Sequence, residues 1–267
     1  MQSSGRVRIL FIGDVMGGAG RDAIARHLPR LREAHDVDIV IANGENVAGG
    51  FGITPPMAED LFHLGIDVVT TGNHLWDRKE ILPYIREASA LLRPANFPAG
   101  VAGRGGGVFT GRGGARVGVI NLMGRLFMKD LDCPFRVGER LVETLRADTP
   151  ILFVDFHAEA TSEKQALAGF LDGRVTAVVG THTHVQTADE GILPGGTAYI
   201  TDVGMTGPHD SIIGVEKAQA IERFLTAMPN KFAVAKNDVR ISAVVVTADA
   251  SSGRALAIER LSVRESA

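Results

Sequence analysis

Short apolar runs alternate with helical patterns through residues 1–90, and this alternation restricts the fold more than any other feature of the sequence. The runs are typical of buried strands and cover 8–12, 38–42 and 67–70. Apolar side chains that recur every three or four positions predict helices over 21–34, 55–64 and 78–86. Strands that are apolar throughout and are separated by helices predict a parallel sheet covered on both faces.

The pattern changes after Pro94. The glycine-rich segment 105–114 predicts a hairpin that leads into a strand over 117–121. Further strands are expected over 151–155, 175–179 and 197–201, and further helices over 163–171 and 219–227. The last two apolar runs, 240–248 and 254–263, predict an antiparallel hairpin. The chain is therefore expected to adopt an α/β fold with a mixed second sheet.

Composition limits both the organisation of the chain and its partners. No Pro/Ser-rich linker or charge block divides the 267 residues, so we expect one domain over 1–267. The only cysteine, Cys133, excludes an intramolecular disulfide, which fits a reducing compartment, and we expect its thiol to be inert. Neither a signal peptide nor a membrane-spanning apolar run is visible, so we expect a cytoplasmic protein. A net charge of −3 argues against binding of long nucleic acid but permits a small anionic ligand held by metal.

Two histidines, His182 and His184, follow the apolar run 175–179. Residues two positions apart in a strand point to the same face, so a strand running out into a loop would present both imidazoles at one place. Imidazole is the commonest protein ligand for transition metals. The pair alone indicates a metal site only moderately, because paired histidines can also be satisfied within a core.

The other apolar runs also end in side chains that can bind metal. These are Asp14 after the first run, Asn43, Glu45 and Asn46 after the second, Asn73 and His74 after the third, and His157 after the run 151–155. In an open α/β sheet, ligands bind at the carboxyl ends of the strands. Carboxylates, amides and imidazoles together suit a two-metal site. Oxygen and nitrogen donors without a thiolate favour Mn, Fe or Zn over Ca.

These segments resemble a known group of enzymes. Gly13-Asp14, Gly72-Asn73-His74, His157 and 180–184 resemble the ordered motifs of the calcineurin-like metallophosphoesterases. A fuller resemblance, to the YmdB-like family of bacterial phosphodiesterases, is carried by 12–15, 43–46, 72–77, 93–98, 155–164, 180–189 and 199–208. The broad superfamily usually has a histidine two residues after the first aspartate and an aspartate as bridging ligand. Here Met16 and Glu45 stand at those places, as in the YmdB-like pattern, and Asn46 is the candidate to replace the histidine.

The resemblance implies two mixed β-sheets packed face to face and flanked by helices, a four-layer α/β/β/α sandwich. It implies one metal ion bound by Asp14, Glu45, Asn46 and His184, and a second bound by Glu45, Asn73, His157 and His182. Fe or Mn is expected, with Zn as a further candidate. A hydroxide between the ions would attack phosphorus in line, and His74 would protonate the leaving alkoxide. The implied substrates are cyclic nucleotides, 2′,3′-cyclic ones above all, with 3′,5′-cyclic AMP as a further candidate.

Other interpretations stay open at this point. Arg125, Thr206 and His209 are candidate substrate contacts, and each also has a plain structural explanation. A regulatory metal- or nucleotide-binding protein with little turnover is the main alternative to an enzyme. The segment 18–23 fits the dinucleotide pattern G-x-G-x-x-A only weakly, because the preceding strand ends several residues earlier. A homo-oligomer is compatible with the sequence.

Overall fold

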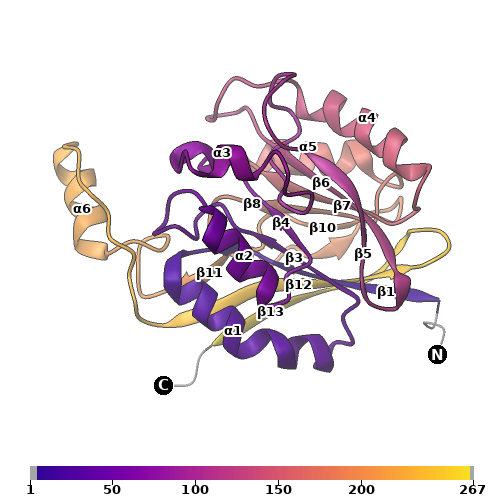
Figure 1. Ribbon diagram of the computed structural model, residues 1–267, viewed down its shortest axis with the longest axis horizontal. Helices are drawn as coiled ribbons and strands as arrows, with labels where there is room; N and C mark the ends of the chain where they lie inside the picture. Colours follow the sequence, from indigo (N-terminus) through magenta and orange to yellow (C-terminus); the bar gives the residue numbers. More distant parts are fainter. Residues whose placement is uncertain (1–4, 265–267) are drawn as a thin grey trace.

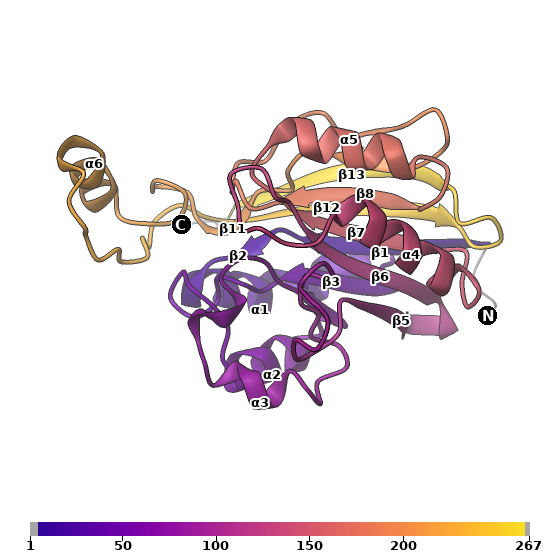
Figure 2. The same ribbon diagram turned by 90° about the horizontal axis from the view of Figure 1, so that it is seen from above.

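Two β-sheets pack face to face, and helices cover the outer face of each (Figures 1 and 2). The computed structural model describes residues 5–264. The helices α1 (Gly17–Ala34), α2 (Pro55–His63) and α3 (Ile81–Tyr84) lie on one outer side. The helices α4 (Pro134–Arg146) and α5 (Thr161–Leu171) lie on the other. This order confirms the expected α/β/β/α sandwich.

The first sheet has the strand order β2-β11-β12-β1-β3-β4, with β13 paired to β12. Its strands are β1 (Arg6–Ile12), β2 (Asp14–Val15), β3 (Ile39–Asn43), β4 (Val68–Thr70), β11 (Met205–Pro208), β12 (Val239–Asp249) and β13 (Ala255–Arg264). The strands β1, β3 and β4 are parallel, as the sequence predicts. However, β12 runs antiparallel to both β1 and β13, so the sheet is mixed, and β12 and β13 form the expected hairpin.

The second sheet has the strand order β5-β6-β7-β8-β10-β9. Its strands are β5 (Gly106–Thr110), β6 (Arg116–Met123), β7 (Leu152–His157), β8 (Ala177–Thr181), β9 (Gly191–Ile192) and β10 (Ala198–Ile200). The four central strands, β6, β7, β8 and β10, are parallel, whereas β5 and β9 are antiparallel edges. The expectation of a mixed second sheet is confirmed.

Alternate side chains of the strands serve two different cores. In β1, Leu10 and Ile12 pack in a cluster with residues of α1 and α2, whereas Ile9 and Phe11 pack between the sheets. Phe11 stacks on Phe153 of the opposite sheet, with ring centroids 5.4 Å apart. Because both faces of these strands are buried, their sequences are apolar throughout rather than alternating.

The helix α1 begins four residues before the predicted start at 21, and α4 and α3 differ more from the sequence-based expectation. We did not predict α4, although its buried Val137 and Leu145 and the intervening Leu141 recur at a helical spacing of four. Conversely, α3 is much shorter than the predicted 78–86. Arg78 has an extended backbone (φ −113°, ψ 101°), and its guanidinium donates hydrogen bonds to the carbonyl oxygens of Ala48 and Phe51. These bonds hold Arg78 outside the helix.

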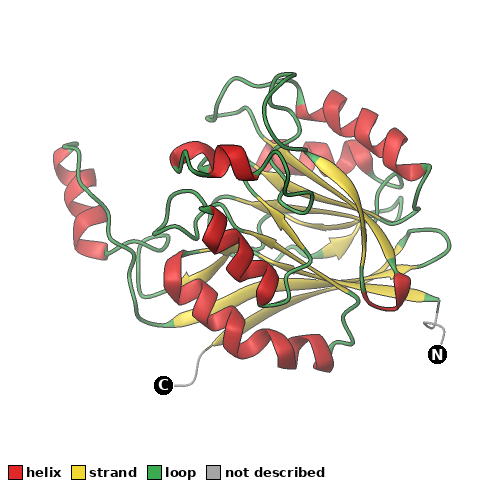
Figure 3. Cartoon of the chain, in the orientation of Figure 1, coloured by secondary structure: helices red, strands yellow, loops and turns green. Residues whose placement is uncertain are grey.

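The helix α6 (Lys217–Thr226) stands away from both sheets (Figures 1 and 3). It belongs to an excursion between β11 and β12 whose two arms meet at the bridge between Val215 and Val234. Within residues 5–264, none of the helices has the length and apolar character needed to cross a bilayer.

Candidate metal centre

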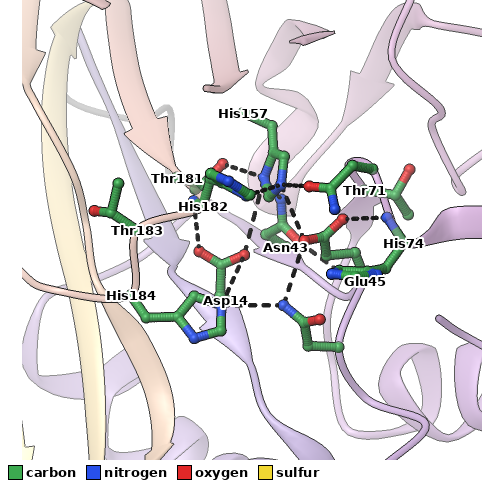
Figure 4. Close-up of polar contacts among 12 residues, drawn as sticks. Asp14, Asn43, Glu45, Thr71, His74, His157, Thr181, His182, Thr183 and His184 are labelled. Atoms are coloured by element: carbon green, nitrogen blue, oxygen red, sulfur yellow. Dashed lines mark hydrogen bonds and ion pairs between the residues drawn. The ribbon is translucent and has the colours of Figure 1, made fainter. Parts of the chain in front are cut away.

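The two sheets deliver polar side chains to one place. Asp14, Glu45 and Asn73 follow β1, β3 and β4 of the first sheet, and His157 ends β7 of the second sheet. His182 and His184 come directly after β8. Figure 4 shows that the labelled carboxylate and imidazole side chains point toward one another. This is the carboxyl-end arrangement that the sequence predicts.

One group of ligands surrounds the Nε2 atom of His157. Its neighbours are Glu45 Oε1 at 2.9 Å, Asn73 Oδ1 at 2.9 Å and His182 Nδ1 at 3.1 Å. Glu45, His157 and His182 also form a cluster with the spacing of metal ligands. A ring nitrogen carries at most one hydrogen and cannot serve three acceptors, so a cation among these atoms would satisfy them better.

A second group surrounds the Nε2 atom of His184. Asn46 Nδ2 lies 3.1 Å from it, and Asp14 Oδ1 lies 3.9 Å from it. Asp14 is fully buried, and its Oδ1 has no hydrogen-bond partner among the described residues. A buried carboxylate oxygen without a donor is costly, and a metal ion would satisfy it. Rotation of the Asn46 amide by half a turn would present its oxygen instead of its nitrogen. The donors of both groups therefore fit metal ions.

The Nδ1 atoms of His157 and His184 already have hydrogen-bond partners. His157 Nδ1 lies 2.9 Å from Thr181 Oγ1, and this hydroxyl donates to Asp155 Oδ1 at 2.8 Å. His184 Nδ1 lies 2.8 Å from the carbonyl oxygen of Ile213. Such outer contacts fix the tautomer and the orientation of metal-binding imidazoles. They leave Nε2 of both rings facing the interior of the site.

The loop that carries the two later histidines departs from strand geometry. His182 and His184 both have left-handed backbones, with φ of 101° and 66°, so simple strand alternation does not describe them. Between them, Thr183 donates hydrogen bonds from its backbone N–H and its hydroxyl to Asp202 Oδ2, at 3.1 and 2.7 Å. Lys164 Nζ lies 2.7 Å from the same oxygen, and this ion pair is almost completely buried. The pair anchors the loop, and each histidine joins a different group of ligands.

The charged groups of the site strongly change one another's pKa values. Burial disfavours the charged forms of Glu45 and His157, but each stabilises the charge of the other. The pKa of Glu45 is therefore lowered to about 2, and the pKa of His157 is raised to about 9. Burial and the nearby His157 charge lower the pKa of His182 to about 3. In the metal-free protein, the imidazolium of His157 is thus the cation among the carboxylates, and a metal ion that bound there would have to displace its proton.

His74 lies at the edge of this cluster and lines a cavity of about 370 Å³. Its backbone N–H donates to Glu45 Oε2 at 3.0 Å, and its Nδ1 lies 2.8 Å from Asp77 Oδ2. The cavity is lined on its polar side by Glu45, Asn46, Glu159, His182, Thr183 and His184. Its remaining walls are Met16, Gly50, Phe51, Ile213, Val215 and Phe232. Met16, Val215 and Phe232 of these walls also pack in one apolar cluster, which we call the apolar end of the cavity.

The structure does not bring the three candidate substrate contacts into this cavity. Arg125 is exposed in the loop after β6. Thr206 is buried in β11, where its hydroxyl donates to the carbonyl oxygen of Ser242. His209 lines a neighbouring cavity, which shares His184 with the first. Their predicted role stays a prediction.

Sequence reasoning missed the partners of the predicted ligands. Asp77 holds the ring of His74, Glu159 Oε2 lies 3.1 Å from His182 Nε2, and the Lys164–Asp202 pair anchors the histidine loop. All four lie inside segments that carry the family resemblance, so a signal for them was present.

Comparisons with known proteins agree with this arrangement. The family described as YmdB-like protein matches residues 10–261. A 2′,3′-cyclic-nucleotide 2′-phosphodiesterase from Bacillus subtilis (strain 168) is 48% identical and aligns with 97% of this chain and 98% of its own length.

Two solved structures share the fold over nearly the whole chain. A hypothetical protein from Thermus thermophilus has a TM-score of 0.91 and 45% identity, with 97% of this chain and 100% of that chain covered. A novel phosphatase from Mycoplasma pneumoniae has a TM-score of 0.89 and 37% identity, with 97% and 94% covered. With its two sheets, its convergent ligands and these relatives, the chain is an enzyme that belongs to the YmdB-like family of phosphodiesterases and phosphatases.

Proposed function

We propose that this enzyme is a binuclear metal-dependent phosphodiesterase that hydrolyses 2′,3′-cyclic nucleotides and releases 3′-nucleotides. The observation that carries the proposal is the convergence of two groups of ligands on Glu45, with His74 beside them. The Bacillus subtilis relative supports the choice of substrate. We include 3′,5′-cyclic AMP as a second candidate substrate.

Each of the two groups of donors would bind one metal ion. One ion would be held by Asp14, Glu45, Asn46 and His184, and the other by Glu45, Asn73, His157 and His182. Bound there, the ions would lower the pKa of a water molecule and neutralise charge on the phosphoryl oxygens. Fe or Mn suits these oxygen and nitrogen donors best, and Zn also fits them.

His74 is the proposed proton donor. When a water oxygen attacks phosphorus, the bond between phosphorus and O2′ breaks, and O2′ leaves as an alkoxide that must gain a proton. Asp77 holds Nδ1 of His74, and Glu45 holds its backbone N–H, so Nε2 is the nitrogen left to donate to O2′. The geometry orients the imidazole before the substrate arrives.

A reconstitution assay tests this proposal. Purified protein, stripped with chelator and reloaded with Mn²⁺ or Fe²⁺, should hydrolyse 2′,3′-cyclic AMP faster than 3′,5′-cyclic AMP and yield only the 3′-nucleotide. Glu45→Gln should lower both the metal content and the turnover, since Glu45 belongs to both groups. The variant Glu87→Gln is the matched control, because Glu87 is exposed and does not line the cavity. If metal-replete protein bound nucleotides without hydrolysing any, a regulatory binding protein would replace the proposed enzyme.

A further inference from the structure

We propose that the apolar end of the cavity binds the nucleobase of the substrate, and that Phe51 and Phe232 form this base subsite. The inference rests on the proposed function, because it requires a nucleotide whose phosphate lies at the metal centre. Both phenylalanines line the same cavity as Glu45 and His184.

The lining of the cavity suits a ligand with one polar and one apolar end. A small phosphodiester alone would need only the polar end, where the carboxylate, amide and imidazole groups lie. The volume of about 370 Å³ lies in the range typical of small-molecule pockets. Met16, Ile213 and Val215 are further apolar side chains of the same lining. A nucleotide has the matching pair of ends, since an anionic phosphate and a flat, stackable base are joined by one sugar.

The contacts of Phe51 place it beside the reacting end. It lies between Gly50 and Gly52, whose positive φ values of 92° and 81° form a tight loop. Arg78 donates a hydrogen bond to the carbonyl oxygen of Phe51 at 3.2 Å, and this bond connects the loop to the segment just before α3. The ring of Phe51 meets the imidazole of His74 edge to face, with centroids 5.0 Å apart. A base that stacks on Phe51 is therefore adjacent to the proposed proton donor.

Phe232 reaches the cavity from the opposite part of the sequence. It follows α6, on the arm that returns to the body where Val234 pairs with Val215. Its ring is half-buried against the cluster that includes Met16, and the guanidinium of Arg223 lies 5.2 Å from its centroid. These contacts hold the ring in place while part of it stays open to the cavity.

Stacking on aromatic rings tolerates every base, because each base has a π-face. We therefore expect the subsite to accept purines and pyrimidines, with purines favoured by their larger stacking area. An ester that lacks a base should be a poor substrate. Stacking typically changes binding by about tenfold or more per base.

A pair of matched substrates tests the inference. 2′,3′-Cyclic AMP and the 2′,3′-cyclic phosphate of methyl riboside share the reacting diester, but only the first carries a base. Wild-type metal-loaded enzyme should show a kcat/KM at least about tenfold higher for the nucleotide. Phe232→Ala should reduce this preference about tenfold, mainly through KM, and Phe232→Tyr should preserve it. Phe224→Ala is the control, since this ring of α6 is 86% exposed.

A binding measurement separates stacking from packing. Calorimetry should show that adenosine 3′-phosphate binds about tenfold more tightly than ribose 3-phosphate, and that Phe232→Ala removes this difference. If Phe232→Ala does not fold, Phe51→Leu takes its place in both experiments. Equal wild-type kcat/KM for the two esters, or equal losses on both in the variants, would overturn the base subsite while the phosphodiesterase stands. If neither ester is hydrolysed, the proposed function is refuted and the subsite with it.

Discussion

The buried ion pair between Lys164 and Asp202 provides the sharpest test of how the histidine loop is held. Asp202 Oδ2 accepts hydrogen bonds from Lys164 Nζ and from both donors of Thr183, and Asp202 Oδ1 accepts one from the N–H of Gly204. Lys164 is 1% exposed and Asp202 is 0% exposed. Asp202→Asn would leave the ammonium of Lys164 buried without a counter-charge, which costs about 3–5 kcal/mol.

The reverse variant should be less severe. In Lys164→Met, the carboxylate of Asp202 keeps its three donors from Thr183 and Gly204 and loses one charged hydrogen bond, worth about 1.5–3 kcal/mol. The double variant Lys164→Met/Asp202→Asn buries no charge, so it should be more stable than Asp202→Asn alone. For a chain of this size, the loss in Asp202→Asn corresponds to about 6–20 °C in Tm.

Thermal and urea unfolding should be measured in the presence of chelator, so that metal binding does not contribute to the stability. Metal content after reloading provides a second readout, since a loosened Thr183 should weaken metal binding by its histidine neighbours. The exposed pair Lys217–Asp210 is the control, and Lys217→Met should leave the stability almost unchanged, because solvent screens exposed ion pairs. Strict additivity of the two buried substitutions would refute the coupling between Lys164 and Asp202.

Three further predictions concern the metal centre itself. His74→Ala should keep its metals and lose about 10²–10⁴-fold in turnover of cyclic nucleotides, yet lose little on bis-p-nitrophenyl phosphate, whose leaving group needs no proton; equal losses on both substrates would contradict the role of His74. Gly72→Ala should abolish metal binding, because a Cβ there would overlap His157 Nε2 and Glu45 Oε2, whereas Gly18→Ala has open space and should retain metal, as elemental analysis can check. Because the pKa of His157 is raised to about 9 from its ordinary 6.5, its charge stabilises metal-free protein fully below pH 6.5, and this contribution is lost as pH rises to 9. Metal affinity should rise over the same pH range by up to about tenfold per pH unit, and titrations that show no pH dependence would exclude competition between the proton and the metal.

Much of the fold could be predicted because both faces of the strands are buried. Runs such as 38–42 and 151–155 are continuously apolar, which marks them as central strands independently of any partner. The antiparallel insertion of β12 beside β1 could not be predicted, because the pairing of strands so distant in sequence leaves no local signal. The short strands β2, β9 and β11 contain too few residues to show a period.

The same distinction applies to the residues of the site. Asp14, Asn73 and His157 could be placed because each follows a strand and the strands end at one edge. The conformations of His182 and His184 could not, since their positive φ values depend on the anchor that Asp202 provides from a distant segment. The apolar walls were also missed, because Phe51 and Phe232 have no common pattern in sequence and meet only through the excursion that carries α6.

The placement of the ligands also links metal binding to the packing of the two sheets. Glu45 follows β3 of the first sheet and His157 ends β7 of the second, and their side chains meet at 2.9 Å. Without metal, the imidazolium of His157 is the cation that joins the sheets at this edge, and a bound metal ion would take over that role by displacing the proton. Since the ligands come from both sheets, an ion that binds them binds only the folded state and therefore stabilises it. Chelation should then lower the Tm of wild-type protein far more than that of Glu45→Gln, and equal shifts would show that the ions do not link the sheets.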